Sequence, residues 1–148
     1  MGQEKVKEKN LVTTKFSANE FPSKSKIYSI IDDLKSYISN NNAIETNFPM
    51  LHVWQESGLF HTTIAIPVNK EISGNSIYAM KRMVPGKILV TQVKGGPFIA
   101  RDSIRQLGIF MTANQMSSPA IPFESLITNR MTEPDTSKWI TKIYYPVF

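Results

Sequence analysis

The stretch that decides the fold is KSKIYSIIDDLKSYISNN at residues 24–41, because a second stretch of the same pattern, PFIARDSIRQLGIFMTAN, follows 73 residues later at 97–114. In both, apolar side chains recur at spacings of four, three and four residues, which is typical of a helix with one buried face. The recurring residues are Ile27, Ile31, Leu34 and Ile38 in the first stretch and Ala100, Ile104, Leu107 and Met111 in the second. The sequence therefore predicts two related helices.

The repeat extends beyond the helices, because IAIPV at 64–68 returns as IYYPV at 143–147, at an offset of 79. The six additional residues lie in a predicted loop around 129–138, where proline and small polar residues interrupt the apolar pattern. We expect a single domain, 1–148, of two halves at about 10–68 and 76–148, related by a pseudo-twofold axis. A central groove along the seam is then the expected place for a ligand.

Each half is predicted to run strand, helix, strand, strand, which makes the fold α+β: an antiparallel sheet with two helices on one side. The expected strands lie at 11–16, 50–54 and 59–66 in the first half, and at 77–83, 87–93, 123–128 and 139–145 in the second. Residues 55–58 are predicted as a four-residue hairpin loop, which would place His52 directly opposite His61. Residues 1–9, with Lys5, Lys7 and Lys9, are predicted to form a flexible basic tail.

Composition excludes several classes of function. The 148 residues are 41% hydrophobic and 20% charged, which is ordinary for a globular fold, and no apolar run approaches the ~20 residues of a membrane span. With no cysteine and two histidines, the chain lacks disulfides, thiolate sites and a three-histidine zinc site. We therefore predict no metal, no cofactor and no catalytic residue. The start lacks a secretory signal, so we expect a cytoplasmic protein, with a lost N-terminal signal or anchor as the open alternative.

The formal charge is +5, and the sequence isoelectric point is about 9.5. Between Lys81 and Arg105, six basic residues accompany one acid, Asp102, which fits either a polyanion-binding patch or ordinary solvated surfaces. No helix-turn-helix, finger or RNA-stacking signature accompanies the charge. The sequence thus argues against nucleic acid as a partner.

Strand alternation divides the first hairpin into two faces. The apolar face, expected to lie under a helix, consists of Leu51, Val53, Phe60, Ile64 and Ile66. The opposite face carries Trp54, His61 and Thr63, and a large aromatic ring there requires cover from a ligand or a partner. His52 and His61 share this face, either as a two-histidine metal site or as a hydrated cross-strand pair. We expect the pair, because no third ligand accompanies them.

The last predicted strand directs Ile140, Lys142 and Tyr144 toward the groove, where Lys142 either holds an anionic ligand group or extends to water. For the neighbouring strand, the cost of burying an unpaired carboxylate favours Glu124 and Leu126 in the groove. Strict repeat alignment would instead match Glu124 to Leu51 in the core; we expect the first register. The predicted ligand-binding residues are Trp54, His61, Thr63, Glu124, Leu126, Ile140, Lys142 and Tyr144.

Four motifs together resemble the GyrI-like (gyrase-inhibitor-like) small-molecule-binding family: VPGK at 84–87, KGGP at 94–97, IPFE at 121–124 and WITKIYYPV at 139–147. The family includes effector-binding domains of bacterial multidrug-responsive transcription activators, and its fold is a duplicated strand–helix–strand–strand unit around a central groove. The resemblance covers nearly the whole chain. PDTSKW at 134–139 is similar to copies in Bacteroidetes-type bacteria.

The resemblance implies a groove tyrosine at Tyr144 and a Phe-Glu pair ending at Glu124. Where the family typically has a glutamate that recognises lipophilic cations or assists hydrolysis, this chain has Lys142, and Leu126 stands where a tyrosine is common. An ammonium cannot act as the carboxylate base. We therefore expect a non-catalytic, effector-type binding domain for small aromatic or lipophilic ligands, with neutral or anionic ones preferred. Two alternatives stay open: a hydrolase that uses Glu124, and a protein-interaction module like the founding gyrase inhibitor.

Overall fold

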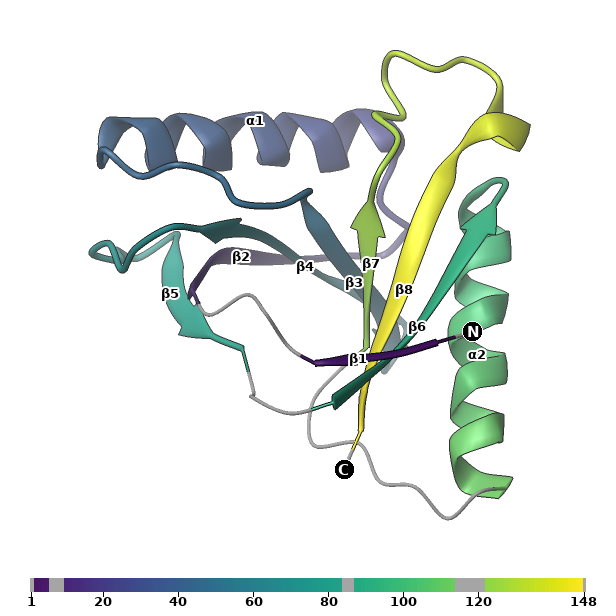
Figure 1. The fold of residues 1–148 in the computed structure, drawn as a ribbon. Helices are drawn as coiled ribbons and strands as arrows, with labels where there is room; N and C mark the ends of the chain where they lie inside the picture. The colour runs from purple at the N-terminus through teal and green to yellow at the C-terminus, as the bar shows by residue number, and fades with distance from the viewer. Residues whose placement is uncertain (1, 6–9, 84–86, 114–121, 148) are drawn as a thin grey trace. The chain divides into compact units, whose positions relative to one another are not determined.

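The computed structural model describes residues 2–5, 10–83, 87–113 and 122–147, and Figure 1 shows the arrangement. The chain divides into two compact units, which we call the first unit (Glu8–Met83) and the second unit (Val84–Phe148 together with Met1–Lys7). Each unit is an antiparallel sheet with one long helix packed on one face, so the α+β class and the duplicated unit are confirmed.

The first unit contains β2 (Asn10–Ala18), α1 (Lys24–Asn40), β3 (Met50–Glu56), β4 (Leu59–Val68) and β5 (Ala79–Arg82). Its strands pair in the order β3-β4-β2-β5, and α1 lies against β2 and β4 (Figure 1). The helix begins after Ser23, whose Oγ accepts a hydrogen bond from the Lys26 backbone N–H at 3.1 Å and so satisfies a free donor of the first turn.

The core of the first unit forms as the helical period predicts. Ile27, Ile31, Leu34 and Ile38 are all buried along α1. On the sheet, the buried apolar residues of the same side are Val12, Leu51, Ile64 and Ile66. Val53, which the alternation also assigns to this side, is only partly buried.

The second unit contains β1 (Gly2–Lys5), β6 (Lys87–Lys94), α2 (Pro97–Ala113), β7 (Phe123–Leu126), the short helix η1 (Thr136–Lys138) and β8 (Ile140–Val147). Its strands pair in the order β1-β6-β8-β7, and α2 lies against β6 and β8 (Figure 1). The core cluster contains Leu89, Ala100, Leu107, Met111 and Ile143, with Val93, Ile104 and Tyr145 partly buried against it.

A glycine is required where β6 turns into α2. Gly95 has φ +143°, and a Cβ there would lie 2.9 Å from Ile99 Cγ1. Its backbone N–H donates to the Trp139 carbonyl at 2.9 Å. Because only glycine adopts this conformation without strain, the turn fixes the point at which α2 begins.

The N-terminal segment differs from the expected flexible tail, because Gly2–Lys5 form strand β1, antiparallel to β6. Lys5 of β1 pairs with Lys87 of β6 in the second unit. In the first unit, Arg82 of β5 pairs with Asn10 of β2. Each sheet thus takes an edge strand from the segment that directly precedes the first long strand of the other unit, β2 or β6. Residues 1 and 6–9 of the predicted tail lie outside the described residues.

The first hairpin also differs from prediction. Its strands extend to Glu56 and from Leu59, so the loop is two residues long, Ser57 and Gly58, with φ of 54° and 78°. Two successive positive φ angles characterise the tight turn that matches the twist of paired strands. The shorter loop moves the register by two residues, so His61 lies opposite Trp54 and not opposite His52.

Other boundaries shift slightly. The strand expected at 77–83 is Ala79–Arg82, the strand expected at 123–128 ends at Leu126, and Asn114, the expected end of the second helix, lies outside the described residues. Within the described ranges, neither helix is long and apolar enough to cross a membrane.

Candidate ligand-binding faces

The helix-free face of the first unit carries a stack of three rings. Successive residues of a strand point to opposite faces, so His52 and Trp54 of β3 and His61 of β4 all point away from α1. The Trp54 ring centroid lies 5.0 Å from that of His52 and 5.2 Å from that of His61, with interplanar angles of 19° and 26°. The indole is therefore enclosed between two imidazoles across the β3–β4 pair.

Polar atoms surround this stack. Ser17 Oγ lies 2.8 Å from His61 Nδ1. Across the register from each other, His52 Nδ1 and Thr63 Oγ1 are both buried, and neither has a hydrogen-bond partner in the described part of the chain. Buried polar atoms are normally paired, so these two represent unused hydrogen-bonding capacity beside an aromatic surface.

Burial also sets the charge of this face. Desolvation lowers the pKa of His52 below its ordinary value of 6.5, because the imidazolium form loses more hydration than the neutral ring. His52 is therefore neutral at pH 7.

The corrected register changes the interpretation of the two histidines. Trp54 lies between their rings, so His52 and His61 do not face each other as the four-residue loop would require. Over the described ranges, no group of three or more histidine, aspartate or glutamate side chains is placed to hold a metal ion.

The helix-free face of the second unit carries a second aromatic pair. Ile140, Lys142 and Tyr144 alternate along β8 with Ile143, which packs under α2. Tyr144 lies opposite Phe123, and their rings stack at 5.0 Å with an interplanar angle of 12°. Lys142 is the next residue of β8 on the same face, and it lies opposite Ser125 of β7 and Gln92 of β6. Phe123 was not among the predicted site residues, although its parity with Ser125 would have placed it here in the correct register.

The predicted register of β7 is wrong. Glu124 lies opposite Ile143 and Leu126 opposite Thr141, so both point to the side covered by α2, and each is only 3% exposed. Strict repeat alignment gives the observed arrangement, because Leu51 lies opposite Ile64 in the first unit. The argument from burial cost assumed that the Glu124 carboxylate had no partner in the core.

That partner is Arg130, from the loop that joins β7 to η1. Its guanidinium lies 3.6 Å from Glu124 Oε1, donates to Thr141 Oγ1 at 3.0 Å, and is 5.1 Å from the centre of the Trp139 ring. Trp139 in turn donates from Nε1 to the Glu133 carbonyl at 2.9 Å. Nothing in the local pattern around Arg130 predicts its burial, which depends on how the loop folds back over the sheet.

Burial dominates the electrostatics of this pair. Desolvation raises the pKa of Glu124 to about 7, and the favourable charge and hydrogen bond of Arg130 offset only part of that increase. With 3% of its surface exposed, the Glu124 carboxyl group is not accessible to a substrate in this conformation.

The structure thus sorts the predicted residues into three groups. Trp54, His61 and Thr63 share the helix-free face of the first unit. Ile140, Lys142 and Tyr144 share the helix-free face of the second, while Glu124 and Leu126 lie on its helix-covered side. That these residues contact a ligand, and that a groove joins the two faces, stay predictions.

This duplicated α+β fold is the fold of GyrI-like proteins with solved structures. Over 99% of the chain, the EcmrR C-terminal domain superposes with a TM-score of 0.80 at 16% identity, covering 96% of that domain. The longer EcmrR chain in a complex with DNA gives 0.78, with 56% of it covered. A hydrolase from Listeria innocua gives 0.66 at 11% identity over 91% of its length. SAV2435 bound to tetraphenylphosphonium gives 0.61 at 15% identity over 93%. No family model and no curated protein sequence matches the chain.

Proposed function

We propose that the chain is a non-catalytic binding module for small aromatic molecules, and that it takes neutral or anionic ligands in preference to cations. The observation that carries the proposal is the ring stack on the helix-free face of the first unit, with Trp54 between His52 and His61. An aromatic ligand gains contact energy against the partly exposed rings of this stack. SAV2435, which shares the fold, has been solved bound to tetraphenylphosphonium, an aromatic cation.

We infer the sign of the ligand charge from Lys142, which the sequence analysis predicts to share one groove with Trp54 and His61. This lysine lies on the helix-free face of the second unit, beside the Phe123–Tyr144 pair. It lies opposite Ser125 of β7, whereas the preceding residue, Glu124, points to the helix-covered side and pairs with Arg130. Glu124 therefore does not offset the charge of Lys142 on this face. At ~4 Å and an effective dielectric constant near 20, two like charges repel by about 4 kcal/mol, which exceeds the gain from one aromatic contact.

The hydrolase alternative required Glu124 to act on a substrate. Its carboxyl group is buried on the helix-covered side and held by Arg130, so the geometry favours a structural role. We therefore expect Glu124→Gln to leave ligand affinity unchanged.

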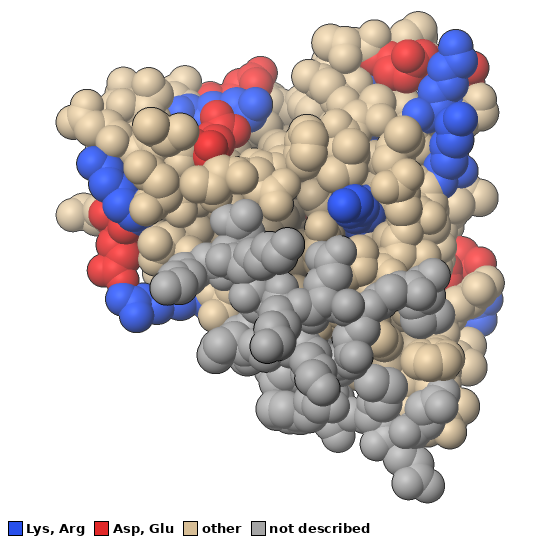
Figure 2. Space-filling view, in the orientation of Figure 1, with Lys and Arg blue, Asp and Glu red and all other residues tan. Residues whose placement is uncertain are grey.

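On the face shown in Figure 2, the charges of the described residues do not favour nucleic acid as a ligand. In the view of Figure 2, the basic side chains of the described residues lie in small groups, several of them beside acidic ones, and do not form a continuous stripe across this face. A nucleic-acid surface usually presents such a stripe to the phosphate backbone.

The test uses two probes of nearly the same shape and opposite charge, tetraphenylborate and tetraphenylphosphonium. Binding is followed by quenching of Trp54 fluorescence, with Trp54→Phe showing the contribution of Trp139. We expect the wild type to bind the anion at least ~10-fold more tightly, a difference of about 1.4 kcal/mol, and Lys142→Glu to reverse the preference. Lys138→Glu, the same charge change at an exposed site on η1, serves as the matched control and should keep the wild-type preference. Equal affinity for both ions in the wild type, with no change in Lys142→Glu, would contradict the proposal.

A further inference from the structure

The outward side of α2 is unusually apolar for an exposed helix surface. Phe98, Ile99 and Ile109 are 76%, 50% and 57% exposed, and Phe110 is 39% exposed. Residues eleven apart on a helix lie on nearly the same side, so Phe98 aligns with Ile109 and Ile99 with Phe110. We call these four residues the α2 outer face; they lie away from the buried residues of the same helix.

The fold itself does not require apolar residues there. In α1, which occupies the equivalent place 73 residues earlier, the positions of Phe98, Ile99 and Ile109 are filled by Ser25, Lys26 and Ser36. These three polar residues are exposed in the same way. Since α1 packs on its sheet with polar residues at these three places, Phe98, Ile99 and Ile109 are not needed for the packing of the helix, whereas Phe110 corresponds to another aromatic residue, Tyr37.

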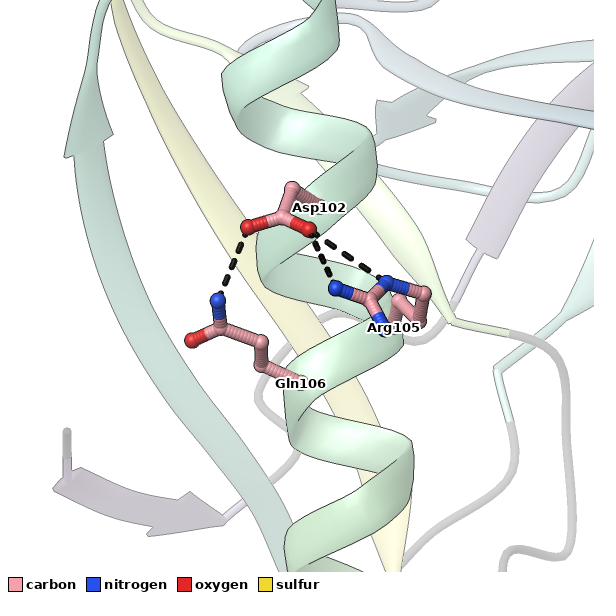
Figure 3. A network of polar contacts seen from close by, with 3 residues as sticks. All are labelled: Asp102, Arg105 and Gln106. Atoms are coloured by element: carbon pink, nitrogen blue, oxygen red, sulfur yellow. Dashed lines mark hydrogen bonds and ion pairs between the residues drawn. The ribbon is translucent and has the colours of Figure 1, made fainter.

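The middle of the same surface is polar, and it carries both signs of charge (Figure 3). Asp102 accepts hydrogen bonds from Arg105, at 2.8 Å from Nη2 and 3.3 Å from Nε, and from Gln106 Nε2 at 2.8 Å. All three side chains are exposed, so these groups are available to a partner as well.

The apolar residues along this surface are palindromic about the level of Ile104, with Phe-Ile at 98–99 and Ile-Phe at 109–110. Between them lie Asp102 and Arg105, whose order is reversed when the helix is read from its other end. A surface that is complementary to itself in reverse is what a twofold contact between identical chains requires.

We propose that the α2 outer face binds a second copy of this chain. The two α2 helices would be antiparallel and would cross at the level of Ile104, whose own side chain faces the core. In that arrangement Phe98 lies level with Phe110 of the partner subunit, and Asp102 lies close to the level of Arg105 of the partner subunit. Both ends of the contact are then apolar, and the centre has two reciprocal ion pairs.

Charge complementarity selects this occupant and this direction. Parallel helices would set Asp102 against the same aspartate, and Arg105 against the same arginine, of the second chain. The antiparallel arrangement pairs opposite charges and also opposes the two helix dipoles. A contact built from one helix face is small, so we expect a weak dimer with a dissociation constant on the order of 10–100 μM.

Sedimentation velocity from about 10 μM to 1 mM tests the association. The wild type should shift from monomer to dimer over this range, and Ile99→Lys with Ile109→Ser, which copies the residues of α1, should weaken the dimer by ~10-fold or more. Asp32→Arg, a charge change on the exposed side of α1, is the matched control and should associate like the wild type. A wild type that stays monomeric at about 1 mM, or an Ile99→Lys/Ile109→Ser variant that dimerises as well as the wild type, would overturn the proposal.

A charge exchange tests the antiparallel pairing independently of the apolar residues. Asp102→Arg and Arg105→Asp should each weaken self-association, because each places like charges together at the centre. Mixed in equal amounts, the two variants should form a heterodimer by native mass spectrometry, because one chain then carries two arginines and the other two aspartates. Self-association that is unchanged in the single variants, or a mixture that forms no heterodimer, would rule out the antiparallel contact.

Discussion

Two threonine hydroxyl groups in the first sheet differ in whether they have a partner. Thr14 Oγ1 donates to the Ile77 carbonyl at 3.1 Å, whereas Thr63 Oγ1 is buried with no partner in the described part of the chain. A buried hydroxyl without a hydrogen bond lowers the stability of the fold, while a bonded one contributes to it.

We expect Thr63→Val to raise the free energy of unfolding by about 1 kcal/mol, because valine has a similar shape and no polar atom to bury. Thr14→Val, the matched control, should lower it by about 1 kcal/mol, because the Ile77 carbonyl loses its donor. Urea unfolding at pH 7 without ligand measures both. A loss of stability in Thr63→Val equal to that in Thr14→Val would mean that the Thr63 hydroxyl is bonded after all.

The buried carboxyl of Glu124 predicts a pH dependence of stability. Its pKa rises from 4.5 in the unfolded chain to about 7 in the fold, so between these values the folded chain holds a proton that the unfolded chain has lost. The stabilising contribution is thus complete below pH 4.5 and is lost as the pH rises through 7, by about 3 kcal/mol in all.

Glu124→Gln should lack this decline, so the difference in free energy of unfolding between wild type and variant should change across it, measured by urea unfolding from pH 4.5 to 8. Arg130→Met should extend the decline to higher pH, because removing the cation raises the pKa of Glu124 further. Identical pH profiles for Glu124→Gln and the wild type would show that Glu124 stays ionised over the whole range.

At the scale of the elements, α1 and α2 play equivalent parts in their two units. Leu34 and Leu107 lie 73 residues apart, and they are 0% and 2% exposed between helix and sheet. The helices have the same length, 17 residues, and opposite chemistry on their outward sides. The two helices therefore share the pattern of their buried residues and differ in the residues that they expose.

Leu34→Ala and Leu107→Ala should each lower the free energy of unfolding by about 2–5 kcal/mol, because a cavity replaces a fully buried side chain. Ser36→Ala, at an exposed position of α1, should change it by less than about 0.5 kcal/mol. Chemical denaturation is sufficient to measure all three. Losses below about half a kcal/mol at both leucines would be incompatible with the packing described above.

On the scale of the whole molecule, the exchange of edge strands makes each sheet depend on a distant part of the chain. β1 comes from the N-terminus and completes the sheet of the second unit, and β5 completes the sheet of the first just before β6 begins. An unpaired edge strand exposes a row of backbone donors and acceptors, so β1 protects β6 both from solvent and from pairing with other chains.

Deletion of residues 1–5 should therefore speed hydrogen exchange at the amides of β6 by ~10-fold or more, which corresponds to a loss of about 1.4 kcal/mol of local stability. The amides of β2, whose partner β5 stays in place, are the internal control and should exchange at the wild-type rate. Mass spectrometry of peptides from both strands reads the two in one experiment. Unchanged exchange in β6 would show that β1 contributes little to this sheet.

Local patterns and internal repetition were sufficient to determine most of the fold. The four-three-four spacing in 24–41 and 97–114 predicts both helices, and the alternation in 50–54 and 59–66 assigns Trp54, His61 and Thr63 to one face. These features depend on neighbours in sequence, so they can be read without the tertiary structure.

The conformation of one turn and contacts between distant residues decided the rest. The positive φ angles at Ser57 and Gly58 shorten the hairpin loop and bring Trp54 between His52 and His61. Arg130 folds back from a loop to pair with Glu124. The sequence by itself determined which residues alternate and repeat, because those patterns are local. The tertiary structure alone decided that Arg130 is the partner of Glu124 and that β1 pairs with β6, because these partners cannot be read from the local pattern.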